Sequence, residues 1–127
     1  MAVVGGLILV VDDEHAVLRL TSSVLSAAGY GVLVAESAVA ALGCFGEEQE
    51  SVLLVLADIM MPQMNGVEMA HRMKEVNPAV RVLFMSGYSD VAAEVEARDS
   101  FPTIRKPFLP EDLVRKVRET IGAPLVS

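Results

Sequence analysis

Short apolar runs alternate along the chain with longer amphipathic stretches. Two runs contain no polar residue at all: residues 7–11 (Leu-Ile-Leu-Val-Val) and residues 52–57 (Val-Leu-Leu-Val-Leu-Ala). Continuous apolar runs of this length are typical of strands buried on both faces of a parallel sheet. Three further runs are shorter or interrupted by polar residues, at residues 32–35, 80–85 and 103–105. The pattern therefore predicts five strands.

The residues after the first apolar run predict a helix with one apolar face. Asp13 and Glu14 suit its N-terminus, and Gly29 suits its C-terminal cap. Apolar residues recur at helical spacing at Val17, Leu20, Val24 and Ala28. We expect this face, Leu20 included, to pack on the sheet.

The next two helices are predicted from their caps. Ser37 is the expected N-cap of a helix over residues 38–45, which Gly46 should end. Asn65 is the expected N-cap of another helix, with Glu68 three residues on in capping-box position. Each stretch lies between two predicted strands, so each is predicted to cross over between them.

The last two helices differ in how much they can bury. A helix from Ser89 or Asp90 through about Ala97 contains few large apolar residues, so we expect it to be loosely held. Pro110 opens the final helix, whose acidic residues precede its basic ones as the helix dipole favours. The chain thus alternates strand and helix five times.

This alternation predicts the fold class. Short connections and right-handed crossovers make a (βα)5 chain an α/β protein, with a doubly wound five-stranded parallel sheet of flavodoxin-like type. We expect residues 1–127 to form one domain, with a core of about residues 7–121. No effector domain follows Ile121, so a stand-alone domain and a segment of a longer protein are both open.

Composition narrows the class of protein further. Hydrophobic residues make up 53% of the 127 residues and charged residues 21%, which suits a folded domain. A net charge of −7 argues against direct binding to nucleic acid. No apolar run reaches the roughly 18 residues of a membrane span, and the N-terminus lacks a basic signal region. The lone Cys44 excludes a disulfide framework, so we expect a cytoplasmic setting.

Polar residues follow four of the predicted strands. Asp12 and Asp13 follow the first, Asp58 the third, Ser86 the fourth and Lys106 the fifth. Because the carboxyl ends of parallel strands meet at one edge of a sheet, these groups should gather there. Two carboxylates about 4 Å apart repel by roughly 4 kcal/mol at an effective dielectric near 20, so three such groups need a cation, or one of them must stay protonated. Oxygen ligands favour Mg²⁺ over zinc.

A divalent ion beside a carboxylate, a lysine and a hydroxyl provides the groups that catalyse phosphoryl transfer. Asp58 is the natural nucleophile, because it is the lone acid at its strand end, and its attack on phosphorus would give an acyl phosphate. Mg²⁺ and Lys106 would neutralise charge on the transferring group, and Ser86 could donate a hydrogen bond to it.

With these motifs the chain closely resembles the receiver domain of two-component response regulators, from residue 7 to residue 121. The resemblance rests on the pair Asp12-Asp13, on Asp58 with Pro62 and Gly66 at their usual offsets, on Ser86-Gly87, and on Lys106-Pro107-Phe108. It implies a signalling domain rather than an enzyme, with Asp58 phosphorylated from a histidine kinase or a histidine phosphotransfer protein. Residues 83–90 look most like receivers attached to hybrid sensor kinases, where the parent protein would be the kinase.

The resemblance also implies roles for single residues. Mg²⁺ would be held by Asp13, Asp58 and the main-chain carbonyl of Met60, with Asp12 supporting through water. Ser86 and Lys106 would contact the phosphoryl group, and the Lys106–Pro107 peptide would be cis. A homodimer through the helix after Tyr88, the strand at residues 103–105 and the final helix is a further expectation. Thr103 departs from the family, which usually carries an aromatic residue there as part of its switch.

Two alternatives belong to other classes of protein. A Mg²⁺-dependent phosphatase with an aspartate nucleophile is disfavoured because Asp58 is followed by Ile59-Met60 rather than by a second acid two residues on. A flavin-binding or dinucleotide-binding module is disfavoured because the first strand-to-helix turn, Asp12-Asp13-Glu14, would repel phosphate where such proteins place glycines.

Overall fold

The computed structural model describes residues 6–87 and 101–122. In chain order the elements are β1 (Leu7–Val11), α1 (His15–Ala27), β2 (Gly31–Ala35), α2 (Ala38–Glu48), β3 (Val52–Asp58), α3 (Gly66–Val76), β4 (Val82–Ser86), β5 (Thr103–Arg105) and α5 (Pro110–Gly122). The helix expected after Tyr88 lies outside the described residues. No described helix is both long enough and apolar enough to cross a bilayer.

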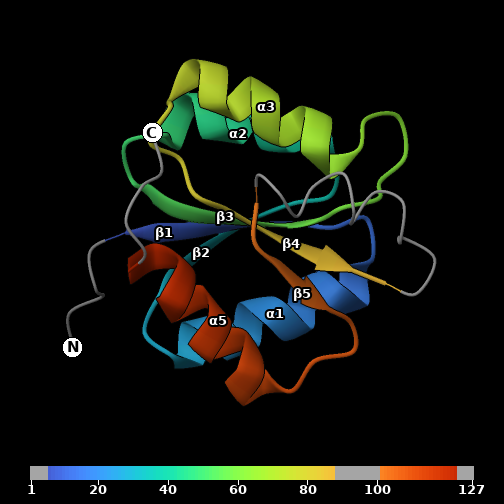
Figure 1. Cartoon of the computed structure of the whole chain (residues 1–127), viewed down its shortest axis with the longest axis vertical. Helices are drawn as coiled ribbons and strands as arrows, with labels where there is room; N and C mark the ends of the chain where they lie inside the picture. The colour runs from blue at the N-terminus through green and yellow to red at the C-terminus, as the bar shows by residue number, and fades with distance from the viewer. Residues whose placement is uncertain (1–5, 88–100, 123–127) are drawn as a thin grey trace.

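The strands form a single five-stranded sheet in the order β2-β1-β3-β4-β5, and every neighbouring pair is parallel. Helices α2 and α3 cover one face of this sheet, and α1 and α5 cover the other (Figure 1). The predicted doubly wound α/β fold is thereby confirmed. The strand order doubles back at β1 and β3, which is where open sheets of this kind bind ligands.

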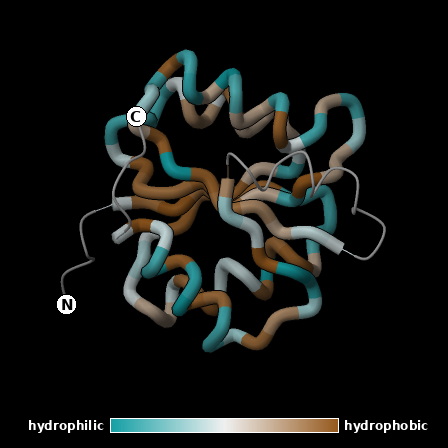
Figure 2. The backbone as a smooth tube through the Cα atoms, in the orientation of Figure 1, coloured by the Kyte–Doolittle hydropathy of each residue, from teal (hydrophilic) through white to brown (hydrophobic). Residues whose placement is uncertain are grey.

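Alternate residues of each strand enter the two halves of the core. In β1, Leu9 and Val11 belong to the cluster under α2 and α3, whereas Ile8 and Val10 belong to the cluster under α1 and α5. All four side chains are 0% exposed. Figure 2 shows the strands as a hydrophobic centre between helices of mixed hydropathy. Burial on both faces explains why β1 and β3 read as unbroken apolar runs.

Helix α1 packs on the sheet through a different face from the one expected. Its buried residues are Leu18, Thr21 and Leu25, whereas Leu20 is 54% exposed. The Thr21 hydroxyl donates a hydrogen bond of 2.7 Å to the Val17 carbonyl, so this polar side chain can be buried without losing a partner. The expectation that Leu20 packs on the sheet was wrong, because the helix buries the face that carries Leu18, Thr21 and Leu25 instead.

Helix α2 extends past the glycine that was expected to end it. It runs to Glu48 and passes through Gly46. A glycine inside a helix costs only about 1 kcal/mol relative to alanine. The neighbouring Phe45 side chain is 0% exposed in the core, and its burial outweighs that cost.

The predicted N-caps of α2 and α3 and the glycine after α1 are confirmed. The Ser37 side chain accepts a hydrogen bond from the Ala40 N–H at the start of α2, and the Asn65 side chain accepts one from the Glu68 N–H at the start of α3. Gly29 has a φ of 101° directly after α1, where the left-handed conformation favours glycine.

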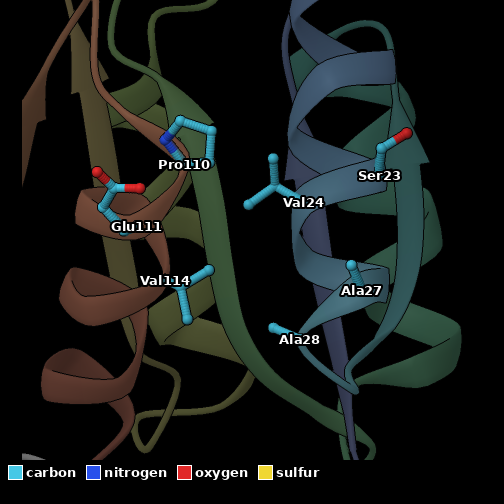
Figure 3. Close-up of a pocket in the computed structure, with 7 residues that line it drawn as sticks. All are labelled: Ser23, Val24, Ala27, Ala28, Pro110, Glu111 and Val114. Atoms are coloured by element: carbon cyan, nitrogen blue, oxygen red, sulfur yellow. The ribbon is translucent and has the colours of Figure 1, made fainter.

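Helices α1 and α5 lie side by side and leave a shallow apolar groove of about 460 Å³ between them. Val24 on α1 and Val114 on α5 face each other across it (Figure 3).

Gly66 at the start of α3 allows the helix to approach the end of β3 closely. A Cβ at this position would lie 2.7 Å from the Asp58 carbonyl oxygen and 2.8 Å from a ring carbon of Phe84. The Gly66 N–H donates to the Ile59 carbonyl at 2.9 Å, which closes the loop after Asp58. The position of this loop therefore depends on the missing side chain.

We expect Gly66→Ala to lower the free energy of unfolding by about 2 kcal/mol, because backbone and a core ring must shift to admit the methyl group. Gly43→Ala is the matched control: Gly43 lies inside α2 with nothing within 4 Å of an added Cβ. That variant should be more stable by about 0.5–1 kcal/mol. Urea unfolding measures both changes, and equal effects of the two variants would contradict the steric argument.

Candidate functional site

The carboxylates that follow β1 and end β3 meet at the carboxyl edge of the sheet. Oxygen atoms of Asp12, Asp13 and Asp58 all lie within 4.8 Å of one another. Asp13 is exposed, but Asp12 is 0% and Asp58 only 6% exposed. Asp58 thus lies at the edge of the sheet, as expected, but is far more enclosed than a surface acid.

The two buried aspartates use their oxygens in the same way. One oxygen of Asp12 accepts a hydrogen bond of 2.9 Å from the Glu14 N–H, and one oxygen of Asp58 accepts one of 3.2 Å from the Met60 N–H. Each bond spans two residues and shapes the turn that leaves the strand. In both residues the second oxygen is directed to Lys106.

Lys106 provides the positive charge that this pair of carboxylates needs. Its Nζ lies 3.2 Å from Asp12 Oδ2 and 3.5 Å from Asp58 Oδ2, and its side chain is 21% exposed. The Lys106 N–H donates to the Ser86 carbonyl at 2.7 Å, so pairing of β5 with β4 sets where the lysine begins. The Lys106–Pro107 peptide is cis, as expected.

Burial and charge act against each other on these groups. Burial raises the pKa of Asp12 above its ordinary value, although the Glu14 N–H and the Lys106 ammonium both act to lower it. Burial alone would lower the pKa of Lys106, but the carboxylates of Asp58 and Asp12 outweigh it and raise that pKa. The lysine is therefore charged at neutral pH.

Ser86 ends β4 beside this cluster with an unused hydroxyl. The residue is 0% exposed, and within the described part of the chain its Oγ has no hydrogen-bond partner. A buried hydroxyl without a partner costs about 1–3 kcal/mol. The cost is recovered when a ligand with acceptor oxygens binds beside it.

The donor set fits a hard divalent cation. Three carboxylates at one point, one of them exposed to solvent, offer the oxygen ligands that Mg²⁺ prefers and leave room for its waters. Cys44, the one cysteine of the chain, lies on α2 and is partly buried against the core, away from this donor set.

The sequence analysis did not find an apolar groove next to this site. Lys106, Pro107 and Phe108 line it from one side, and Val17 and Leu20 of α1 line it from the other, with a volume of about 390 Å³. The signal is the exposure of Leu20 next to Val17, Pro107 and Phe108, because a contiguous exposed apolar surface can mark an interaction site.

A doubly wound sheet with this arrangement at its carboxyl edge is typical of a phosphoacceptor signalling domain. Residues 8–118 match the family described as "Response regulator receiver domain". The chain belongs to this family, and its role is that of a two-component receiver, not that of a phosphatase or a flavin-binding module. Members of the family interact with histidine kinases or phosphotransfer proteins and generally bind Mg²⁺ at an acidic pocket.

Similar proteins include stand-alone receivers and parts of longer chains. The chain is 33% identical to the response regulator receiver protein CpdR of Brucella abortus, over 91% of this chain and 97% of that protein. It is 31% identical to the response regulator TmoT of Ectopseudomonas mendocina and 32% identical to the sensor kinase CckA of Brucella abortus. These alignments cover about 90% of this chain, but 52% of TmoT and 12% of CckA.

Solved receiver structures have the same fold. A receiver domain protein from Clostridium thermocellum aligns with a TM-score of 0.85 at 29% identity, over 91% of this chain and 94% of that one. The receiver domain of the hybrid histidine kinase CckA aligns with a TM-score of 0.77 at 25% identity, over 91% of this chain and 99% of that one.

We expect Lys106→Met to lower the free energy of unfolding by about 2 kcal/mol at pH 7, because two enclosed carboxylates lose their counter-charge. Arg118→Met, at an exposed position of α5, is the charge-matched control and should change stability by less than about 0.5 kcal/mol.

The loss in Lys106→Met should depend on pH. The pKa of Asp12 is already raised above 3.8 by burial, and without the lysine it rises further. An acid with a raised pKa takes up a proton more readily in the folded state, so stability falls as pH rises through the window above 3.8. The variant should therefore lose more stability than wild type between about pH 4 and pH 7. Parallel curves in urea unfolding at both pH values would contradict this.

Proposed function

We propose that Asp58 is the residue of this receiver that accepts the phosphoryl group. The observation that carries the proposal is the approach of the Lys106 ammonium to Asp58 Oδ2 at 3.5 Å, near the Ser86 hydroxyl, which has no hydrogen-bond partner among the described residues. The Asp58 carboxylate thus lies beside a positive charge, and a hydroxyl donor ends the neighbouring strand β4; both groups suit a phosphoryl group.

In the transfer, an oxygen of Asp58 forms a bond to phosphorus as the bond from phosphorus to the donor's imidazole nitrogen breaks. The electron pair of that bond stays on the imidazole, and Asp58 becomes an acyl phosphate. Lys106 offsets charge on the phosphoryl oxygens, and Ser86 donates a hydrogen bond to one of them.

The residues that would hold Mg²⁺ are Asp13, Asp58 and the main-chain carbonyl of Met60, with Asp12 supporting through water. A bound Mg²⁺ would neutralise charge on the transferring group. The close approach of the three carboxylates supports this assignment. Asp12 is the least accessible of them and is also nearest to Lys106, so a supporting role suits it.

We infer that the phosphodonor is a histidine kinase or a histidine phosphotransfer protein, the partners of the receiver family in general. The groove lined by Leu20 and Phe108 shares Lys106 with the acidic site, so a partner seated there would bring its phosphohistidine close to Asp58. Residues 1–127 would act as one receiver domain in the cytoplasm. The homodimer expected through β5 and α5 also needs a helix outside the described residues and stays a prediction.

The proposal is tested by incubation with acetyl phosphate and Mg²⁺, followed by mass spectrometry of the intact chain. Wild type should gain one phosphoryl group that hydroxylamine removes, as an acyl phosphate requires. Asp58→Asn should gain none, whereas Asp112→Asn, a surface aspartate that pairs with Arg115 on α5, should behave as wild type. Equal uptake by Asp58→Asn and wild type, or none by either, would contradict the proposal.

The same assay tests whether the Ser86 hydroxyl contributes to phosphoryl transfer. Ser86→Ala removes a buried donor without a partner, so the fold should stay as stable or gain about 1 kcal/mol, while phosphoryl uptake slows. Ser22→Ala is the matched control, because Ser22 Oγ on α1 is likewise buried without a partner but lies outside the acidic site. It should leave uptake unchanged; equal slowing in both variants would remove Ser86 from the mechanism.

The docking groove gives a separate prediction. Leu20→Asp should slow transfer from a phosphohistidine protein about tenfold or more, because a charge replaces an apolar contact, and should leave uptake from acetyl phosphate unchanged. Val39→Asp, on α2 and 59% exposed, is the control outside the groove. The purified phosphotransfer domain of a hybrid kinase provides the donor, and slowing from both donors would place Leu20 in the fold rather than at the interface.

A further inference from the structure

A pocket of about 760 Å³ lies on the other side of α1 from the α1–α5 groove. It is formed by α1, the outer strand β2 and the first residues of α2. Leu18 and Val34 contribute apolar surface, and Arg19, Ser22 and Glu36 contribute polar groups. It shares no residue with the acidic cluster, so phosphoryl chemistry does not account for it.

Strand β2 leaves one of its two edges open at this pocket. Within the described residues it pairs only with β1. The Ala35 carbonyl accepts a hydrogen bond from the Asp12 N–H, so Ala35 faces β1. Because successive residues of a strand direct their backbone groups to opposite edges, Val34 and Val32 present their N–H and C=O groups outward.

This edge lacks the usual protection against pairing with another chain. Natural edge strands are blunted by charged residues, by proline or by being very short. Strand β2 reads Gly-Val-Leu-Val-Ala over five residues, and Val34 is 53% exposed. The opposite edge, β5, is three residues long and ends in Arg105. The two edges of one sheet therefore differ in their capacity to accept a further strand.

The polar groups beside β2 favour an acidic occupant. The Oγ of Ser22 is buried and has no hydrogen-bond partner among the described residues. Arg19 is exposed and makes no ion pair within the described part of the chain, whereas His15 is already paired with Glu36. Arg19 is thus a cation on the α1 side of the pocket that no carboxylate of the described residues pairs with.

We propose that this pocket binds an extended acidic segment of a partner protein, which adds a strand to the open edge of β2. The segment pairs its backbone with Val32 and Val34. A side chain opposite Val34 points to the same face as Val34, toward α1, where a carboxylate pairs with Arg19. The surface is separate from the phosphoacceptor site and does not depend on its function.

The α1–α5 groove has no comparable features that would specify its ligand. Its lining is almost wholly apolar, with Ser23 and Glu111 as its polar residues (Figure 3). The β2 pocket differs because the open backbone edge of β2 and the Arg19 cation together define what would bind.

The test uses the full chain and the peptide Val-Thr-Glu-Thr-Val, acetylated and amidated at its ends, with Val-Thr-Lys-Thr-Val as the charge-reversed control. Titration to about 1 mM peptide, followed by amide NMR spectra, should shift the signals of β2 and slow hydrogen exchange of the Val32 and Val34 amides. The Leu33 amide faces β1 and should change little. No shift at this concentration, or shifts centred on Asp12 and Asp58, would overturn the proposal.

Two variants separate the backbone from the charge contribution. Val34→Pro removes an N–H that the fold does not use, at an edge position where proline is tolerated, and should abolish binding. Arg19→Glu should weaken binding of the glutamate peptide about tenfold or more and make the lysine peptide the better ligand. If Val34→Pro fails to fold, the result for Arg19→Glu decides. An Arg19→Glu variant that still prefers the glutamate peptide overturns the proposal.

Two further measurements distinguish other occupants. Asp58→Asn should bind the peptide as wild type does, and binding that needed Asp58 would place the peptide at the acidic site instead. Sedimentation of the chain without peptide should show a monomer. A dimer whose contacts protect the Val32 and Val34 amides would assign the edge to a second copy and overturn the partner proposal.

Discussion

The structure of the site depends on the Lys106 ammonium, which lies between two enclosed carboxylates. Asp12 and Asp58 repel each other, and burial removes the water that would otherwise screen them. The lysine offsets this repulsion, and it can do so only because β5 pairs with β4 and starts the Lys106 side chain next to Ser86. A residue 94 positions away from Asp12 in sequence thus stabilises the end of β1. The sheet and the site stabilise each other through this contact.

Without a ligand, the site also contains an unsatisfied hydrogen-bond donor, which a bound phosphoryl group would satisfy. Ser86 is buried at the end of β4 with an unused hydroxyl, and the exposed Asp13 completes a set of oxygens suited to a cation. Nearby, Phe101 is 4% exposed and packs edge-on against Phe84, with ring centroids 5.3 Å apart. Thr103, paired with Phe84 across the sheet, stands where the family usually has an aromatic residue. The aromatic contact next to the site therefore lies in the core under α3, two residues before the usual position.

Where the sequence analysis succeeded, a strong local signal agreed with the tertiary contacts. The runs of β1 and β3 are apolar because both faces of each strand are buried, and Ser37 and Asn65 cap helices through bonds that span three residues. Where it failed, local signals were ambiguous. Helix α1 has apolar residues on two overlapping faces, and the sheet contacts the one with Leu18 and Leu25 because Thr21 satisfies its hydroxyl within the helix. Gly46 stays helical because burial of Phe45 outweighs its cost.

The chain by itself determined the order of strands and helices and the types of side chain at each strand end, because periodicity and caps act over a few residues. It therefore determined which acids, hydroxyl and amine come to the carboxyl edge of the sheet. Only the tertiary structure decided how deeply each is enclosed, which oxygen of Asp12 and Asp58 is directed to Lys106, and which apolar side chains stay exposed beside the site and along β2. Those properties depend on contacts between segments far apart in sequence, and no local pattern encodes them.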